Sequence, residues 1–237
     1  FCVNVALDAG GVHLVIADDR DEAAYFYNDL YGFLDPERVF FFPTAYKRSI
    51  EYNKEDPSGL VQRSTVLNAL KNHTDGYLVV CTYPEAILEK VVTANKLREN
   101  TLKITAGEKL PIPFIAEVLQ KYNFTKVDFV YEPGQYSVRG GIIDIFSFSD
   151  NKPYRLDFFD DEIESIRQFD IGTQLSVGKV DALEILPDTK NTAIATEVES
   201  LMKFAGDAVL WVNDYEYMLK RFADIRVKLL HDMADRG

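Results

Sequence analysis

The chain has 237 residues, 47% of them hydrophobic and 27% charged, which suits one large domain or two small ones. Its 26 basic and 38 acidic residues give a formal net charge of −12, so a nucleic-acid backbone is repelled unless basic residues cluster locally. The two cysteines, Cys2 and Cys81, lie far apart, which favours a reducing, cytoplasmic compartment over a secreted disulfide scaffold. No apolar run reaches the roughly 18 residues of a membrane span, and we expect a soluble protein with no membrane contact.

The first part of the chain alternates between strand and helix patterns. We interpret the apolar segment that starts at Phe1 as the end of an element begun earlier, and we expect the chain to be a fragment. Acidic residues precede the first helix pattern, as suits the positive end of a helix dipole. Strands are predicted at 13–18, 39–42 and 77–82, and helices at 23–30, 60–70 and 84–92. This alternation predicts a parallel sheet covered by helices.

The pattern changes in the middle of the chain and then returns. A helix is predicted at 112–122, and short strands separated by turn residues follow from 127 to 169, which indicates an antiparallel meander. A helix at 196–204, a strand at 208–212 and a helix at 215–230 resume the first pattern. We therefore predict an α/β fold, in which a discontinuous parallel-sheet domain of residues 1–104 and 186–237 carries an inserted α+β domain at 105–185.

The residue pattern offers little for catalysis or metal binding. His13, His73 and His231 lack the spacing of zinc ligands. The acidic residues between Asp157 and Glu164 fit either a magnesium site or a solvated hairpin tip. No stretch matches the glycine-rich, lysine-bearing loop that cradles ATP phosphates, and the glycine motif of dinucleotide binding is absent as well. We expect no catalytic residue, metal or cofactor in this chain.

The predicted strand at 154–159 carries an unusual outer side. A period of two places Arg155, Asp157 and Phe159 on the face opposite Leu156 and its neighbours. An aromatic residue beside an arginine is typical of protein contacts, and Arg139 precedes the next turn near the same surface. The alternative is that Phe159 packs under a loop and the arginines pair with local carboxylates.

A long run of these residues resembles a known family. The segments VRGGIIDIF (138–146), YRLDFFDDEIE (154–164) and RQFD (167–170) are similar to the inserted domain shared by the bacterial excinuclease protein UvrB and the transcription-repair coupling factor. The segments 41–44, 63–70, 79–82 and 84–86 resemble the surrounding α/β domain. The resemblance implies a RecA-like parallel-sheet domain, with segments like UvrB domains 1a and 1b, and an insert like UvrB domain 2.

Two departures distinguish the two relatives. UvrB has a long tyrosine-rich hairpin that slides between DNA strands, whereas here only residues 44–62 are available, with Tyr46 and Tyr52 as the aromatic residues. UvrB also has a phosphate-binding loop, which is missing from this chain. Both departures favour the N-terminal, UvrB-like module of the transcription-repair coupling factor.

The resemblance implies a noncatalytic adaptor that recruits UvrA, the damage-recognition protein of the excinuclease, to a stalled RNA polymerase. The family's contact residues match Arg139, Arg155 and Phe159. It also implies that a distant C-terminal part of the full-length protein masks this surface. Polymerase and DNA are expected to bind outside this fragment, and ATP and Mg only at a downstream motor.

Two alternatives stay open. One is a helicase or damage-binding fragment like UvrB. The other is a DNA-binding module without catalysis, which requires a basic stripe that the dispersed basic residues do not form.

Overall fold

The computed structural model describes residues 8–45, 57–189 and 196–234. The segment that starts at Phe1 and the aromatic residues Tyr46 and Tyr52 lie outside these ranges. The chain forms two compact units, one made of Phe1–Val91 and Glu199–Gly237 and the other of Val92–Val198. In the part of the chain that is described, no helix combines the length and apolar character needed to cross a membrane.

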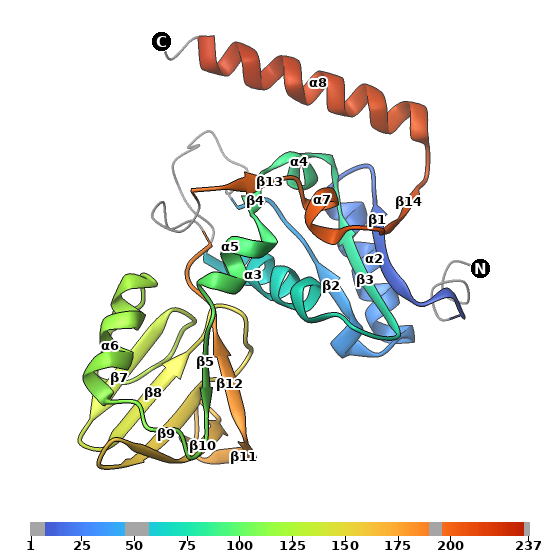
Figure 1. The fold of residues 1–237 in the computed structure, drawn as a ribbon. Coiled ribbons are helices and arrows are strands. Elements are labelled where there is room, and N and C mark those ends of the chain that lie inside the picture. Colours follow the sequence, from blue (N-terminus) through green and yellow to red (C-terminus); the bar gives the residue numbers. More distant parts are fainter. Residues whose placement is uncertain (1–7, 46–56, 190–195, 235–237) are drawn as a thin grey trace. The chain divides into compact units, whose positions relative to one another are not determined.

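The first unit is built on a four-stranded parallel sheet with the strand order β14-β1-β3-β2 (Figure 1). Because β14 comes from the end of the chain and pairs with β1, both flanking segments contribute to one sheet. In chain order the elements are β1 (Gly11–Ile16), α2 (Arg20–Phe33), the 3-10 turn η1 (Pro36–Arg38), β2 (Val39–Phe41), α3 (Pro57–Asn72), β3 (Tyr77–Thr82), α4 (Pro84–Leu88), α7 (Leu201–Ala205), β14 (Val209–Val212) and α8 (Tyr215–Ala234). The boundaries between the two units fall within the short strands β4 (Val91–Val92) and β13 (Val198–Glu199).

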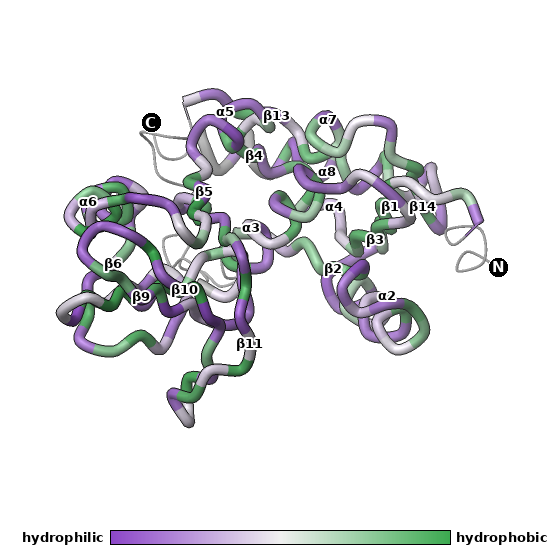
Figure 2. The backbone as a smooth tube through the Cα atoms, turned by 60° about the horizontal axis from the view of Figure 1, so that its bottom comes forward, coloured by the Kyte–Doolittle hydropathy of each residue, from purple (hydrophilic) through white to green (hydrophobic). Residues whose placement is uncertain are grey.

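Local sequence explains the best-defined elements of this unit. Strand β3 is buried from Leu78 to Thr82 and is a hydrophobic stretch of the backbone in Figure 2, as expected for a central strand of a parallel sheet. Helix α2 begins after Asp19, whose carboxylate accepts hydrogen bonds from the backbone N–H groups of Asp21 and Glu22. Helix α2 packs on β3 around Val79 and Cys81.

Two predicted helices are shorter in the structure than the pattern indicated. The helix predicted at 84–92 ends at Leu88, and Val91 and Val92 form strand β4 instead. The helix predicted at 196–204 begins only at Leu201, after strand β13. Strands β4 and β13 pair with each other, and valine, being β-branched, favours that extended conformation.

The second unit contains a six-stranded sheet in the order β11-β10-β9-β8-β7-β6. Neighbours from β7 to β11 are antiparallel, which confirms the predicted meander, while β6 runs parallel to β7. The elements are α5 (Ala94–Glu99), β5 (Leu102–Thr105), α6 (Ile112–Lys121), β6 (Thr125–Lys126), β7 (Gln135–Arg139), β8 (Ile142–Phe146), β9 (Tyr154–Phe159), β10 (Glu162–Phe169), β11 (Ser176–Val180) and β12 (Ala182–Ile185).

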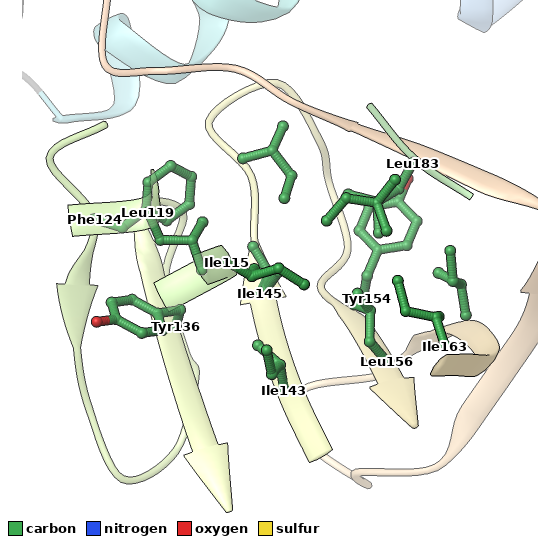
Figure 3. Packing of buried hydrophobic residues seen from close by; sticks show 13 residues of the cluster. Ile115, Leu119, Phe124, Tyr136, Ile143, Ile145, Tyr154, Leu156, Ile163 and Leu183 are labelled. Carbon is green, nitrogen blue, oxygen red and sulfur yellow. The ribbon is translucent and has the colours of Figure 1, made fainter. Parts of the chain in front are cut away.

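One face of this sheet, the inner face, holds the hydrophobic core of the unit. Helix α6 contributes Ile115 and Leu119, which lie over strands β7 and β8 (Figure 3). The antiparallel pair β5–β12 adds Ile104 and Leu183 to the same cluster. This packing explains why the insert, predicted to start at residue 105, takes in β5: its buried Ile104 belongs to the insert core.

Candidate protein-binding face of the inserted unit

The outer face of the six-stranded sheet, opposite α6, carries the predicted contact residues. Along β9, Tyr154 and Leu156 are buried in the core, whereas Arg155 and Phe159 point to the other side. The predicted alternation is therefore confirmed. We use the term outer face for six residues of this side, namely Arg139, Asp144, Arg155, Asp157, Phe159 and Arg167.

Asp144 is the centre of the outer face. Strands β8 and β9 pair Asp144 directly with Arg155, and the carboxylate is 1% exposed. Arg155 binds it with two hydrogen bonds, from Nε to Oδ1 at 2.7 Å and from Nη2 to Oδ2 at 2.9 Å. This forked geometry gives a strong charge-assisted contact, and it raises the pKa of Arg155 above its ordinary value. The guanidinium also lies 4.5 Å from the centre of the buried Phe169 ring.

Arg139 binds the same carboxylate from the neighbouring strand. Its Nη2 donates to Oδ2 of Asp144 at 2.5 Å, and its Nη1 donates to the backbone oxygen of Asp128 at 2.7 Å. The guanidinium carbon lies 4.8 Å from the centre of the Phe129 ring. Asp144 thus joins two guanidinium groups into one buried ionic cluster, and one partner remains if the other is lost.

A second ion pair lies beside this cluster. Nη2 of Arg167 donates to Oδ2 of Asp157 at 2.5 Å, and the hydroxyl of Ser165 donates to the same oxygen at 2.7 Å. Asp157 therefore holds an arginine, and Asp160 and Asp161 form the turn between β9 and β10. Asp160 and Asp161 are thus the tip of the β9–β10 hairpin, whereas Glu162 and Glu164 lie on β10.

Phe159 is the exposed aromatic residue of this face. It is 67% exposed, so it does not pack under a loop. The arginines, by contrast, do pair with local carboxylates, and the side chain of Arg155 is only 18% exposed. Arg155 and Phe159 are four residues apart, about 13 Å at 3.3 Å per residue, with Asp157 between them. The face therefore presents a prearranged ionic surface with Phe159 at its edge, rather than free arginines.

Sequence reasoning missed Asp144 and Phe129. The two-residue turn at Gly140 and Gly141 pairs Arg139 with Ile142 and so fixes the β7–β8 register. This register, which the sequence indicates, places Asp144 of β8 near Arg139. Gly140 adopts a φ of +57°, a conformation that glycine accepts without strain. The β8–β9 register, which brings Arg155 opposite Asp144, depends on the irregular 147–153 connection and has no such signal.

The turn between β1 and α2 is the position at which a parallel sheet commonly binds phosphate. Here the backbone N–H of Asp18 donates to the Glu22 carboxylate at 2.8 Å, and Asp19 accepts from two N–H groups of α2. Burial, followed by the nearby charges of Glu22 and Asp214, raises the pKa of Asp18. Carboxylates therefore already occupy donors that a phosphate would need, and their charge repels it.

Other reactive side chains have structural partners. His13 is buried in β1, where its Nδ1 accepts from Nε1 of Trp211 on β14 at 3.1 Å. Burial raises the pKa of the Cys81 thiol to about 12, so this thiol is unreactive at neutral pH. Within the described ranges, no three His, Cys, Asp or Glu side chains are arranged so that they could hold a metal ion.

Comparison with known proteins identifies the inserted unit. Residues 102–190 match the model of the UvrB interaction domain. Transcription-repair-coupling factors are similar over a longer stretch: that of Escherichia coli is 29% identical over 75% of this chain, and that of a Staphylococcus aureus strain 30% identical over 78%. The factor of Haemophilus influenzae is 37% identical over 43% of the chain. The chain spans only 9% to 15% of the length of these relatives.

The matched segment runs from β5 to just beyond β12 and thus lies within the second unit. The chain therefore carries an interaction domain and is an interaction module of the kind found in DNA repair proteins. The predicted resemblance to the N-terminal, UvrB-like module of the bacterial transcription-repair coupling factor is confirmed.

Proposed function

We propose that the outer face of the inserted unit binds the excinuclease protein UvrA and recruits it to an RNA polymerase stalled at DNA damage. The observation that carries the proposal is Phe159, an exposed aromatic side chain on a UvrB interaction domain. Aromatic side chains that enter a partner's pocket commonly dominate binding energy. Arg139 and Arg155 are the other contact residues, and Asp144 already orients their guanidinium groups.

The prearranged arginines suit binding because their conformational entropy is lost on folding rather than on association. Each guanidinium has five N–H groups, and Asp144 uses only some of them. The remaining donors can meet acceptors of the partner, while Phe159 excludes water at the edge. We therefore place Arg139, Arg155 and Phe159 in one interface, with Asp144 as its internal support.

The same family resemblance carries the finer parts of the proposal. The parallel-sheet unit is RecA-like and the insert is like UvrB domain 2. In the full-length protein, a C-terminal part masks the outer face until polymerase is engaged, and polymerase and DNA bind elsewhere. ATP and Mg serve only a motor outside this chain, and the module works in the cytoplasm. The alternative of a helicase like UvrB is disfavoured by the carboxylates at the β1–α2 turn.

A binding titration with UvrA tests the proposal. Phe159→Ala should weaken binding about thirtyfold, since truncating an aromatic residue that fills a partner's pocket typically costs about 2 kcal/mol. The matched control is Phe33→Ala, which removes an 80% exposed phenylalanine from α2 in the other unit and should leave affinity unchanged. Equal affinities for wild type and Phe159→Ala, at equal melting temperature, would contradict the proposed interface.

A further inference from the structure

A second exposed aromatic side chain, Phe129, adjoins the ionic cluster of the outer face. Phe129 lies in the connection between β6 and β7 and is 50% exposed. Its ring faces the Arg139 guanidinium, whose carbon is 4.8 Å from the ring centre. That distance is within the range of a cation–π contact. Phe129 is not among the residues described as packing in the hydrophobic core on the inner face.

The backbone on both sides of Phe129 is fixed. On one side, Nη1 of Arg139 holds the backbone oxygen of Asp128 at 2.7 Å. On the other side, Val130 is 1% exposed and anchors the chain. The backbone N–H of Val127 also donates to the oxygen of Tyr136 on β7 at 2.9 Å. Phe129 therefore lies on a backbone segment that hydrogen bonds and a buried neighbour fix in place, and its ring is half exposed.

Phe129 and Phe159 can reach the same partner. Arg139 pairs with Ile142, which pairs with Asp157, so Arg139 and Phe159 lie two strands apart and two residues along β9. At about 4.8 Å between strands and 3.3 Å per residue, their Cα atoms are about 12 Å apart. A standard interface covers about 800 Å² on each partner, which spans this distance easily.

We propose that Phe129 is a second aromatic contact for UvrA, an inference that rests on the proposed function. Together with Phe159, this gives two exposed phenylalanines beside the Arg139–Asp144–Arg155 cluster. The partner surface that fits this arrangement has two apolar pockets flanking acceptor groups. The stacked guanidinium of Arg139 contributes as well, because its contact with the Phe129 ring strengthens when water is excluded.

The test is a titration of UvrA with the full chain and its Phe129→Ala variant. We expect Phe129→Ala to weaken binding about tenfold without changing the melting temperature. The matched control is Phe114→Ala, since Phe114 is 46% exposed on α6, which packs on the inner face. Phe129→Tyr keeps the ring and should bind like wild type, whereas Phe129→Leu keeps an apolar side chain without the ring and should bind like Phe129→Ala.

The outcomes separate this inference from the proposed function. If Phe159→Ala loses affinity while Phe129→Ala and Phe129→Leu both bind like wild type, the inference is overturned and the proposed function stands. If the wild-type chain does not bind UvrA, the proposed function fails first. If Phe129→Ala lowers the melting temperature, the comparison of Phe129→Leu with Phe129→Tyr at equal melting temperature replaces it. The inference then requires weaker binding by Phe129→Leu than by Phe129→Tyr, because only Phe129→Leu lacks the ring.

Discussion

Two carboxylates of the inserted unit, Asp144 and Asp150, have different electrostatic surroundings. Asp144 is neutralised by Arg139 and Arg155 in a forked ionic cluster. Among its described contacts, Asp150 accepts hydrogen bonds only from hydroxyl groups, those of Tyr154, Ser149 and Ser147. A buried charge is tolerated when it is paired and is costly when it is not. Removing an arginine partner of Asp144 and removing the charge of Asp150 should therefore have opposite consequences for stability.

Arg155→Ala should destabilise the inserted unit. It removes two of the three arginine hydrogen bonds to the buried Asp144 carboxylate, and breaking a buried ion pair typically costs about 3 kcal/mol. Denaturant unfolding followed by circular dichroism measures the change. Lys152→Ala, which removes an exposed positive charge from the same unit, should change the free energy of unfolding by less than about 0.5 kcal/mol. Equal denaturation midpoints for Arg155→Ala and wild type would mean that the folded unit tolerates the buried Asp144 carboxylate without Arg155.

Asp150→Asn should stabilise the protein at neutral pH. Burial raises the pKa of Asp150, so the folded state binds its proton more tightly than the unfolded state. Its contribution to stability is therefore present at low pH and is lost as pH rises through the folded pKa. The amide carries no charge and avoids this loss. Melting temperatures at several pH values should show the variant above wild type at pH 7, with the difference closing toward pH 3. A constant difference would contradict the titration of Asp150.

Only part of the candidate site could be predicted from the sequence. A period of two placed Arg155 and Phe159 on one face because β9 is regular and Leu156 must face the core. The pairing of Arg155 with Asp144 could not be predicted, since it depends on cross-strand register across an irregular connection. The position of Phe129 depends on a loop contact with Arg139, which no periodic pattern encodes.

At the scale of elements, one buried arginine links a helix to two loops. Arg63 projects from α3, and its Nη1 donates to the backbone oxygen of Pro43 at 2.8 Å and contacts Oε2 of Glu89 at 3.1 Å. Its guanidinium carbon lies 4.1 Å from the centre of the Phe42 ring. The contacts reach the chain after β2 and the chain after α4, so the side chain fixes how α3 packs on the end of the sheet.

Arg63→Met should lower the free energy of unfolding by about 3 kcal/mol. Methionine keeps the apolar contact with Phe42 but leaves the Pro43 carbonyl and the Glu89 carboxylate without this donor. Gln62→Met, at an exposed position one residue earlier on α3, serves as the control for helix propensity. Chemical denaturation of both variants measures the effect, and a similar stability for the two would refute the linking role of Arg63.

Regular elements with strong periodicity were predicted well and short ones were not. Strand β3 has the predicted bounds, because an apolar run bounded by turn residues has no competing interpretation. Strands β4 and β13 were assigned to helices because each has only two residues, and their conformation depends on pairing with the other. A single-sequence pattern contains no information about a partner strand more than a hundred residues away.

At the scale of the whole molecule, the acidic charge and the interaction domain point to a binding role. The net charge of −12 and the carboxylates of the β1–α2 turn oppose phosphate binding. We therefore expect that isothermal titration with ATP and Mg at millimolar concentration gives no binding heat, and that ATP leaves the melting temperature unchanged. Micromolar affinity in either measurement would contradict this expectation and favour the UvrB-like helicase alternative.

We propose that UvrA docks on the outer face of the inserted unit, and not on its α6 side or on the parallel-sheet unit. Hydrogen–deuterium exchange of the chain with and without UvrA tests it most directly. We expect slower exchange on binding at the Gly140–Gly141 and Asp160–Asp161 turns, which end the strands carrying Arg139 and Phe159. Helices α6 and α2 should exchange at unchanged rates. Protection confined to α6 or α2, with both turns unaffected, would show that UvrA binds another surface.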